Sequence, residues 1–185
     1  MSALAYSMPD GAKLICRCVE VNSDSEDSTE PHQEQEVVEI LTTEPLATYK
    51  KIDIASESFD IHGSSMDMHG DVMAYLKDSK TLVVLNIATS EVMHNVAVPF
   101  ASDDEWVTAL AFSQGAHHIV VATGDENVPI RERTRLWAFD KYTGAFDADN
   151  KPAYCSLHEV SAVAGSALGL VMGFMDGRVV IKDHS

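Results

Sequence analysis

The chain has 185 residues, of which 45% are hydrophobic, with 13 basic and 29 acidic side chains. This length suits one ordinary domain or a piece of a larger one, and the apolar fraction excludes wholesale disorder. A formal charge of −16 argues against broad adhesion to phosphate backbones or anionic membranes, because both attractions need a basic surface.

No secretory signal is expected in residues 1–11, since they lack a basic start and a long apolar stretch. From Leu14 to Val21 the sequence is rich in strand formers, so residues 1–21 are predicted to be a tail with one possible strand. Three cysteines form no even-numbered framework, which favours a reducing compartment. Cys16 and Cys18 are interpreted as strand thiols, because a zinc site needs about four ligands.

The acidic charge gathers in residues 22–48, which we expect to be a flexible segment. Its first ten residues have almost no apolar side chain and cannot offset their own ordering entropy. Ser23, with Glu26 three residues later, resembles an acidophilic kinase site, although a simple solvated tether is the favoured alternative. Glu34 to Leu41 is the one stretch that could form a brief helix.

Residues 49–185 change to short apolar runs broken by Gly, Asp, Asn and Ser. The intervals between runs are too short for crossover helices, so the sequence predicts an all-β fold. Val160 to Met175 is uncharged but has only 16 residues, whereas a membrane-spanning helix needs about 20. The runs of strand length are Val72–Leu76, Leu82–Leu85, Val107–Phe112, Ile119–Ala122 and Val179–Ile181.

An internal repeat is the most informative pattern: an apolar strand, an acidic turn, then a second apolar strand that ends in Asn or Asp. The turn residues Asp78, Asp125 and Asp176 are 47 and 51 residues apart. Propeller repeats run about 40–45 residues, lengthened by loop insertions such as residues 126–133. The second strands end in Leu85-Asn86, Phe139-Asp140 and Lys182-Asp183.

Two details strengthen the repeat. The turn Asn86 to Ser90 matches Asp140 to Gly144 in character, position by position. Trp106 to Ser113 alternates and ends in a turn, as an innermost propeller strand should, and Val160 to Ala164 fills the same place before the third copy. A single twisted sheet cannot bury both faces, so neighbouring blades are expected to stack.

On these residues, positions 49–185 resemble a divergent WD-repeat β-propeller. The name-giving Trp-Asp pair is altered in every copy, and no Gly-His precedes an innermost strand. The polar network of His, Ser or Thr, Trp and Asp that the family uses is therefore expected to be incomplete. About two and a half blades are present, whereas a closed propeller needs about 4–8. We therefore expect an unpaired edge, an open apolar face and a longer parent protein.

A narrower resemblance comes from Tyr49–Ile52, Leu82–Ser90 and Glu105–Leu110. Together they are similar to the opening blades of the transducin-β-like WD-repeat subunits of the small-subunit processome, in the U3 ribonucleoprotein-associated UtpB assembly. The resemblance implies a nuclear, nucleolar scaffold in rRNA processing and ribosome biogenesis, with WD-repeat proteins as partners and RNA contacted indirectly.

Chemistry-bearing motifs are weak. His117 and His118 are adjacent and would point to opposite faces of a strand, and no metal-binding or nucleophile motif occurs. We therefore expect no catalytic residue, metal, cofactor or small-molecule substrate, and the bulky aromatic residues are assigned to the core. Arg131, Arg133 and Arg135 form a basic hairpin tip that could touch RNA or an acidic partner, although a mixed-charge solvated loop is the favoured alternative.

Three functions stay open from the sequence. The first is the nucleolar scaffold, and the second is a generic cytosolic or nuclear WD-repeat adaptor that binds peptide motifs. The third and weakest is an enzyme with a cryptic His/Asp site.

Overall fold

A computed structural model gives the fold of the chain. All the regular elements among its described residues are β-strands. The described residues are 3–7, 13–21, 35–43, 46–53, 66–77, 80–113, 115, 117–125, 127, 134–146, 154–156, 158–166 and 169–182.

Residues 1–63 form one compact unit and residues 64–185 a second. The first unit holds an antiparallel sheet in the order β1-β2-β3-β4. Its strands are β1 (Ala3–Ser7), β2 (Lys13–Val21), β3 (Gln35–Thr43) and β4 (Leu46–Asp53).

This sheet corrects one expectation. The possible helix at Glu34 to Leu41 is wrong, because Gln35 to Leu41 lie in β3, which pairs with β2 from Leu14↔Thr42 to Val21↔Gln35. Of the segment expected to be flexible, residues 22–34 lie outside the described residues, and residues 35–43 and 46–48 belong to β3 and β4, whose pairing satisfies their backbone groups. Tyr49 to Ile52, assigned to an opening blade, lies in β4 of the same sheet.

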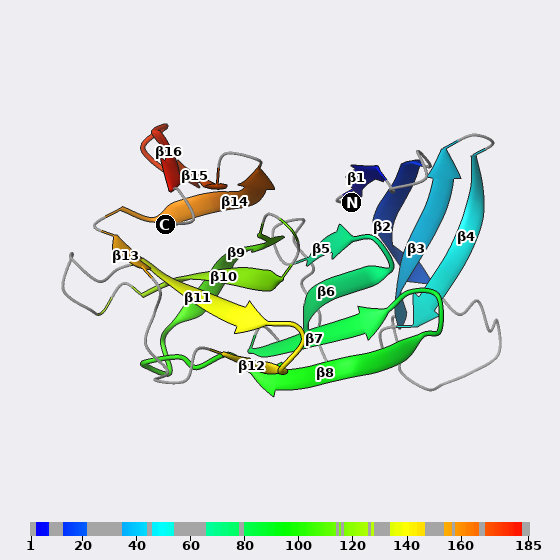
Figure 1. The fold of residues 1–185 in the computed structure, drawn as a ribbon, viewed down its shortest axis with the longest axis horizontal. Coiled ribbons are helices and arrows are strands. Elements are labelled where there is room, and N and C mark those ends of the chain that lie inside the picture. The colour runs from blue at the N-terminus through cyan, green and yellow to red at the C-terminus, as the bar shows by residue number, and fades with distance from the viewer. Residues whose placement is uncertain are drawn as a thin grey trace, which may run out of the picture. The chain divides into compact units, whose positions relative to one another are not determined.

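The second unit contains three antiparallel sheets that follow one another along the chain (Figure 1). The first has the order β5-β6-β7-β8, the second β12-β11-β10-β9 with β13 also paired to β11, and the third β14-β15-β16. The strands of the first sheet are β5 (Met66–His69), β6 (Val72–Lys77), β7 (Thr81–Asn86) and β8 (Glu91–Ala97). Those of the other two are β9 (Trp106–Phe112), β10 (His118–Gly124), β11 (Thr134–Asp140), β12 (Ala145–Phe146), β13 (Tyr154–Ser156), β14 (Val160–Ser166), β15 (Gly169–Phe174) and β16 (Val179–Lys182).

The prediction of an all-β, partial β-propeller is confirmed. The three repeat hairpins are β6-β7, β10-β11 and β15-β16, and β9 and β14 fill the innermost positions expected for them. Two sheets have a complete set of strands and the third has three among the described residues. Strand β5 was not anticipated: Met66 and Met68 alternate with polar residues, but the run has only four residues.

The middle sheet is buried on both faces, and β10 shows how. Ile119 and Val121 face the first sheet, whereas Val120 and Ala122 face the third. Side chains alternate between the two faces of a strand, so a continuous apolar run requires a neighbour on each side. All four side chains are at most 8% exposed.

Each contact between sheets has its own cluster of buried side chains. The first joins Ala74, Leu76, Leu82, Val84 and Val98 of the first sheet to Leu110, Phe112, Ile119, Val121, Trp137, Phe139 and Phe146 of the second. The second joins Ala109, Val120, Ala122 and Leu136 of the second sheet to Val160, Leu170, Met172 and Phe174 of the third. The sheets therefore stack through two separate apolar layers.

The matched turns adopt the same geometry. Asn86 Oδ1 accepts from Thr89 N at 3.1 Å, and Asp140 Oδ1 accepts from Thr143 N at 3.0 Å. Each turn ends in the left-handed region, at Ser90 (φ 63°) and Gly144 (φ 74°). The sequence similarity therefore reflects one repeated turn. Gly144 cannot gain a Cβ freely, since that atom would lie 2.6 Å from Nδ1 of His94.

Equivalent positions in two repeats give a direct test of the stack. Leu136 lies opposite Ala122 and is 2% exposed, whereas Val179 lies opposite Gly173 and is 68% exposed. We expect Leu136→Ala to lower the free energy of unfolding by about 2–5 kcal/mol through the lost contacts and the cavity. Val179→Ala should change it by less than about 0.5 kcal/mol. Urea denaturation measures both, and equal losses would contradict the two-layer arrangement.

Candidate functional site

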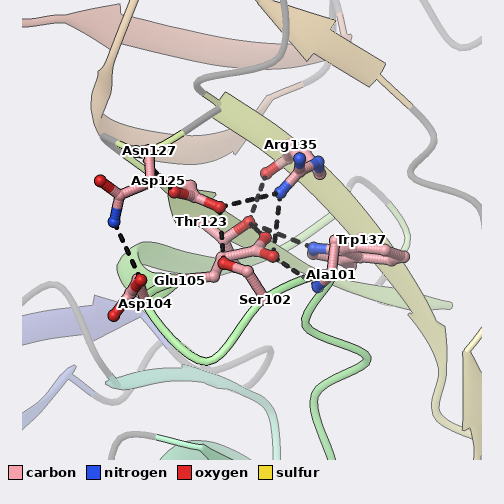
Figure 2. Close-up of polar contacts among 9 residues, drawn as sticks. All are labelled: Ala101, Ser102, Asp104, Glu105, Thr123, Asp125, Asn127, Arg135 and Trp137. Atoms are coloured by element: carbon pink, nitrogen blue, oxygen red, sulfur yellow. Dashed lines mark hydrogen bonds and ion pairs between the residues drawn. The ribbon is translucent and has the colours of Figure 1, made fainter. Parts of the chain in front are cut away.

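A cluster of polar side chains is buried where the strands of the middle sheet begin and end. Glu105 immediately precedes β9, Thr123 lies near the end of β10 and Asp125 follows it, and Arg135 and Trp137 lie in β11. All five are at most 6% exposed. Figure 2 shows these side chains pointing toward one another from the three strands.

The Glu105 carboxylate is the centre of this cluster. Its Oε2 accepts from the Ala101 backbone N–H at 2.6 Å and from Arg135 Nη1 at 2.9 Å. Its Oε1 accepts from the Thr123 hydroxyl. Three donors therefore compensate a carboxylate that burial would otherwise penalise.

The remaining contacts extend the cluster on both sides. Trp137 Nε1 donates to Thr123 Oγ1 at 3.2 Å. Asp125 accepts from Ser102 Oγ at 2.7 Å and from the Asn127 backbone N–H at 2.9 Å, and its Oδ2 lies 3.9 Å from Arg135 Nη1. The cluster thus ties the loop before β9 to the turn between β10 and β11 (Figure 2).

A buried polar cluster forms here although no Gly-His precedes β9 and the Trp-Asp position is Phe139-Asp140. Thr123, Trp137 and Asp125 are assembled, and Glu105 stands immediately before the innermost strand, where the resembled family has His. Arg135 supplies the positive charge that Glu105 needs. The sequence signal was faint, because Glu105 and Arg135 are 30 residues apart and neither belongs to a motif.

Polar contacts also join neighbouring sheets. Asp67 of β5 accepts from the Phe112 backbone N–H at 2.6 Å, and Thr134 Oγ1 accepts from Val160 N at 3.3 Å. Nε2 of His94, in β8, lies 2.7 Å from the Lys141 carbonyl oxygen. The stack is therefore fixed by directional bonds as well as by apolar contact.

The structure places the predicted site residues in different environments. Arg135 is not at an exposed tip: it is buried and paired with Glu105, so it cannot contact a partner as expected. Phe139 is fully buried in the core between the first two sheets. Asp176 is exposed, and its Oδ2 lies 2.8 Å from Arg178 Nε and 3.3 Å from His158 Nδ1. Ser23, Asp78, Arg131, Arg133 and Asp183 lie outside the described residues.

Most of the aromatic residues assigned to the core lie there. Phe112, Trp137 and Phe174 are 3–6% exposed, and Trp106 is half-buried. Within the described ranges, no group of three or more His, Cys, Asp or Glu side chains is placed to hold a metal ion. No helix among the described residues is long and apolar enough to cross a membrane.

Neither a family model nor a curated protein matches the chain. Among solved structures, the computationally designed Ika4 protein is similar with a TM-score of 0.51 and 16% identity, over 83% of this chain and 87% of that one. An oligogalacturonate lyase from Vibrio parahaemolyticus has a TM-score of 0.49 and 11% identity. The match covers 100% of this chain and 60% of the lyase. A chain of the Mitotic Checkpoint Complex is also similar, with a TM-score of 0.49 and 16% identity. The match covers 96% of this chain and 48% of that one. At these identities the likeness is one of fold.

The buried ion pair can be tested by a double-mutant cycle. We expect Glu105→Gln and Arg135→Met each to lower the free energy of unfolding by about 3–5 kcal/mol, because each leaves a buried charge without its partner. The double variant should lose less than the sum of the two, by about 0.5–3 kcal/mol. Urea denaturation of all four proteins gives the coupling.

The exposed pair of Asp176 and Arg178 is the matched control. Its side chains are 38% and 54% exposed, so its coupling should be weak because solvent screens it. Additive losses at Glu105 and Arg135 would show that the two side chains do not stabilise one another.

The lowered pKa of Asp140 predicts that the free energy of unfolding depends on pH. Hydrogen bonds from the backbone N–H groups of Thr143 and Tyr142 lower the pKa of its carboxyl group. Its contribution to stability is therefore present above the unfolded aspartate pKa of about 4 and is lost as the pH falls through the lower folded value. In unfolding measurements, Asp140→Ala should be less stable than the wild type at neutral pH, and the difference should shrink below about pH 4. A difference that stays constant from neutral pH to pH 3 would contradict this.

Proposed function

We propose that the chain is a non-catalytic protein-interaction scaffold. The observation that carries the proposal is the bonding of the buried polar cluster. Glu105 accepts from three groups, and Asp125 accepts from Ser102 and Asn127. These charges hold strands together in positions closed to solvent, so they serve the fold and leave recognition to the surfaces of the stack.

The exposed histidine pairing also fits a structural role. His158 shares the Asp176 carboxylate with Arg178, whose backbone N–H also donates to Asp176 at 3.1 Å. The Asp176 carboxylate therefore stabilises the turn between β15 and β16 by accepting a backbone hydrogen bond within that turn. The His/Asp enzyme is accordingly the weakest of the three functions, and loss of an activity in His158→Ala with folding intact would favour it.

The finer proposal is a place in nucleolar ribosome assembly, with other WD-repeat proteins as partners and RNA reached through them. It rests on the sequence resemblance of Tyr49–Ile52, Leu82–Ser90 and Glu105–Leu110. In the structure the last two stretches form β7 with its turn and the start of β9, and Leu82 and Leu110 both belong to the first apolar layer. The alternative is an adaptor that binds peptide motifs in another complex.

Gradient sedimentation separates these possibilities. Expressed at native level, the chain should move with pre-ribosomal particles that contain U3 RNA, and RNase treatment should leave it bound to proteins. A chain that sediments alone would contradict the scaffold proposal. Sedimentation in a large complex without U3 RNA would retain the scaffold, exclude the ribosome-assembly role and favour the adaptor.

A further inference from the structure

One serine in the loop before β9 is followed directly by three acidic residues. Ser102 precedes Asp103, Asp104 and Glu105, and no other Ser or Thr in the chain is followed by so long an acidic run. Protein kinases select substrates in part by the charge pattern around the acceptor residue, and acidophilic serine kinases read carboxylates that follow the serine. Ser102 fits such an enzyme better than Ser23, where another serine interrupts the acidic run.

The loop presents this sequence at the surface. Ala101, Asp103 and Asp104 are exposed, and Ser102 is half-buried. Glu105 turns inward and is 3% exposed, so a kinase that meets the folded chain can read the first two carboxylates. A loop held by a few hydrogen bonds opens locally at a far lower cost than a core strand. The serine hydroxyl can therefore enter a kinase active site without unfolding of the sheets.

The hydroxyl group of Ser102 belongs to the buried polar cluster. Its Oγ donates to Asp125 Oδ2 at 2.7 Å, and Asp125 is 1% exposed. Of the nine residues drawn in Figure 2, one is cationic, Arg135, and three are acidic: Asp104, Glu105 and Asp125. The cluster therefore accommodates a neutral hydroxyl donor at this position, in surroundings where acidic side chains outnumber the basic one.

We propose that Ser102 is a phosphorylation site for an acidophilic serine kinase, and that the phosphoryl group releases the loop before β9 from the buried cluster. In the reaction, Ser102 Oγ attacks the γ-phosphorus of Mg²⁺-bound ATP in the kinase. The new oxygen–phosphorus bond forms as the bond from that phosphorus to ADP breaks, and the hydroxyl proton passes to the catalytic aspartate of the kinase. This modification does not depend on which partners the chain binds, so it can be tested apart from the scaffold function.

Phosphorylation would change both the hydrogen bonding and the charge of this contact. The ester oxygen of phosphoserine has no proton to donate to Asp125, so the bond that ties the loop to the turn after β10 is lost. The phosphoryl group also carries about −1.5 to −2 charges at pH 7. Next to acidic side chains, such a group disrupts a contact by like-charge repulsion and by the cost of desolvation.

The alternative is that the phosphoryl group pairs with Arg135 and tightens the loop. Arg135 Nη1 already lies 2.9 Å from Glu105 Oε2 and 3.9 Å from Asp125 Oδ2. A phosphoryl group would gain the guanidinium only by displacing a carboxylate, which would then be buried without its partner at a high cost. Repulsion is therefore expected to prevail over the new pairing.

Phosphorylation of the full folded chain tests the site. A purified acidophilic serine kinase with MgATP acts on the wild type and on Asp103→Asn, and tandem mass spectrometry locates and quantifies the phosphate. A short acidic serine peptide verifies that the kinase is active. We expect phosphate at Ser102 in the wild type, and a rate at least about five-fold lower in Asp103→Asn, which removes a carboxylate that the kinase reads. Asp103 is exposed and lies outside the residues of Figure 2, so this variant leaves the drawn cluster intact.

Absence of phosphate at Ser102 in the folded chain would overturn the proposal. An unchanged rate in Asp103→Asn would also overturn it, because the acidic run would then not be what the kinase recognises.

Amide hydrogen exchange tests the release of the loop. The Ala101 backbone N–H donates to Glu105 Oε2, and the Asn127 backbone N–H donates to Asp125 Oδ1 at 2.9 Å. These two amides therefore report on the two sides of the contact. We expect exchange at both to be at least about ten-fold faster in the phosphorylated chain, because release of the loop exposes them to water.

Two controls separate a local effect of charge from other causes. The Thr143 backbone N–H donates to Asp140 Oδ1 in a turn outside the cluster, and its exchange should not change. Ser102→Ala removes the hydrogen bond without adding charge, so it should accelerate exchange at Ala101 and Asn127 less than phosphorylation does. Unchanged or slower exchange at Ala101 and Asn127, equal acceleration at Thr143, or an equal effect of Ser102→Ala would each overturn the proposed release.

Discussion

The second unit depends on one constraint: a strand that is apolar on both faces must lie between two neighbours. Strand β10 meets it by sending Ile119 and Val121 to one side and Val120 and Ala122 to the other. Neither the first nor the third sheet alone could cover all four side chains. The middle sheet therefore fixes the order of the stack, and stability is shared between nearest neighbours, as in other repeat proteins.

The same constraint decides where charge can be buried. The middle of β10 belongs to the apolar layers, so polar side chains enter only at its end, where Thr123 and Asp125 meet Glu105 and Arg135. A buried ion pair is tolerated when hydrogen bonds satisfy its remaining atoms. Here the hydrogen bonds to Glu105 come from the loop before β9 and from β11. The cluster therefore fixes the register between the strands of the middle sheet, which the apolar contacts alone would specify less well.

The repeat hairpins could be predicted because their signal is local: an apolar run, a turn residue and a second run lie within 14 residues at Met73–Asn86, 21 at Val120–Asp140 and 13 at Val171–Asp183. Strand β3 could not be predicted, because Val37, Val38 and Leu41 also fit a helical spacing. Only the pairing with β2, which is distant in sequence, selects a strand. The outer strand β8 has a mostly exposed pattern that gives no apolar signal. The pairing of Glu105 with Arg135 is also non-local, because the two residues are 30 positions apart, and so it could not be predicted from a sequence motif.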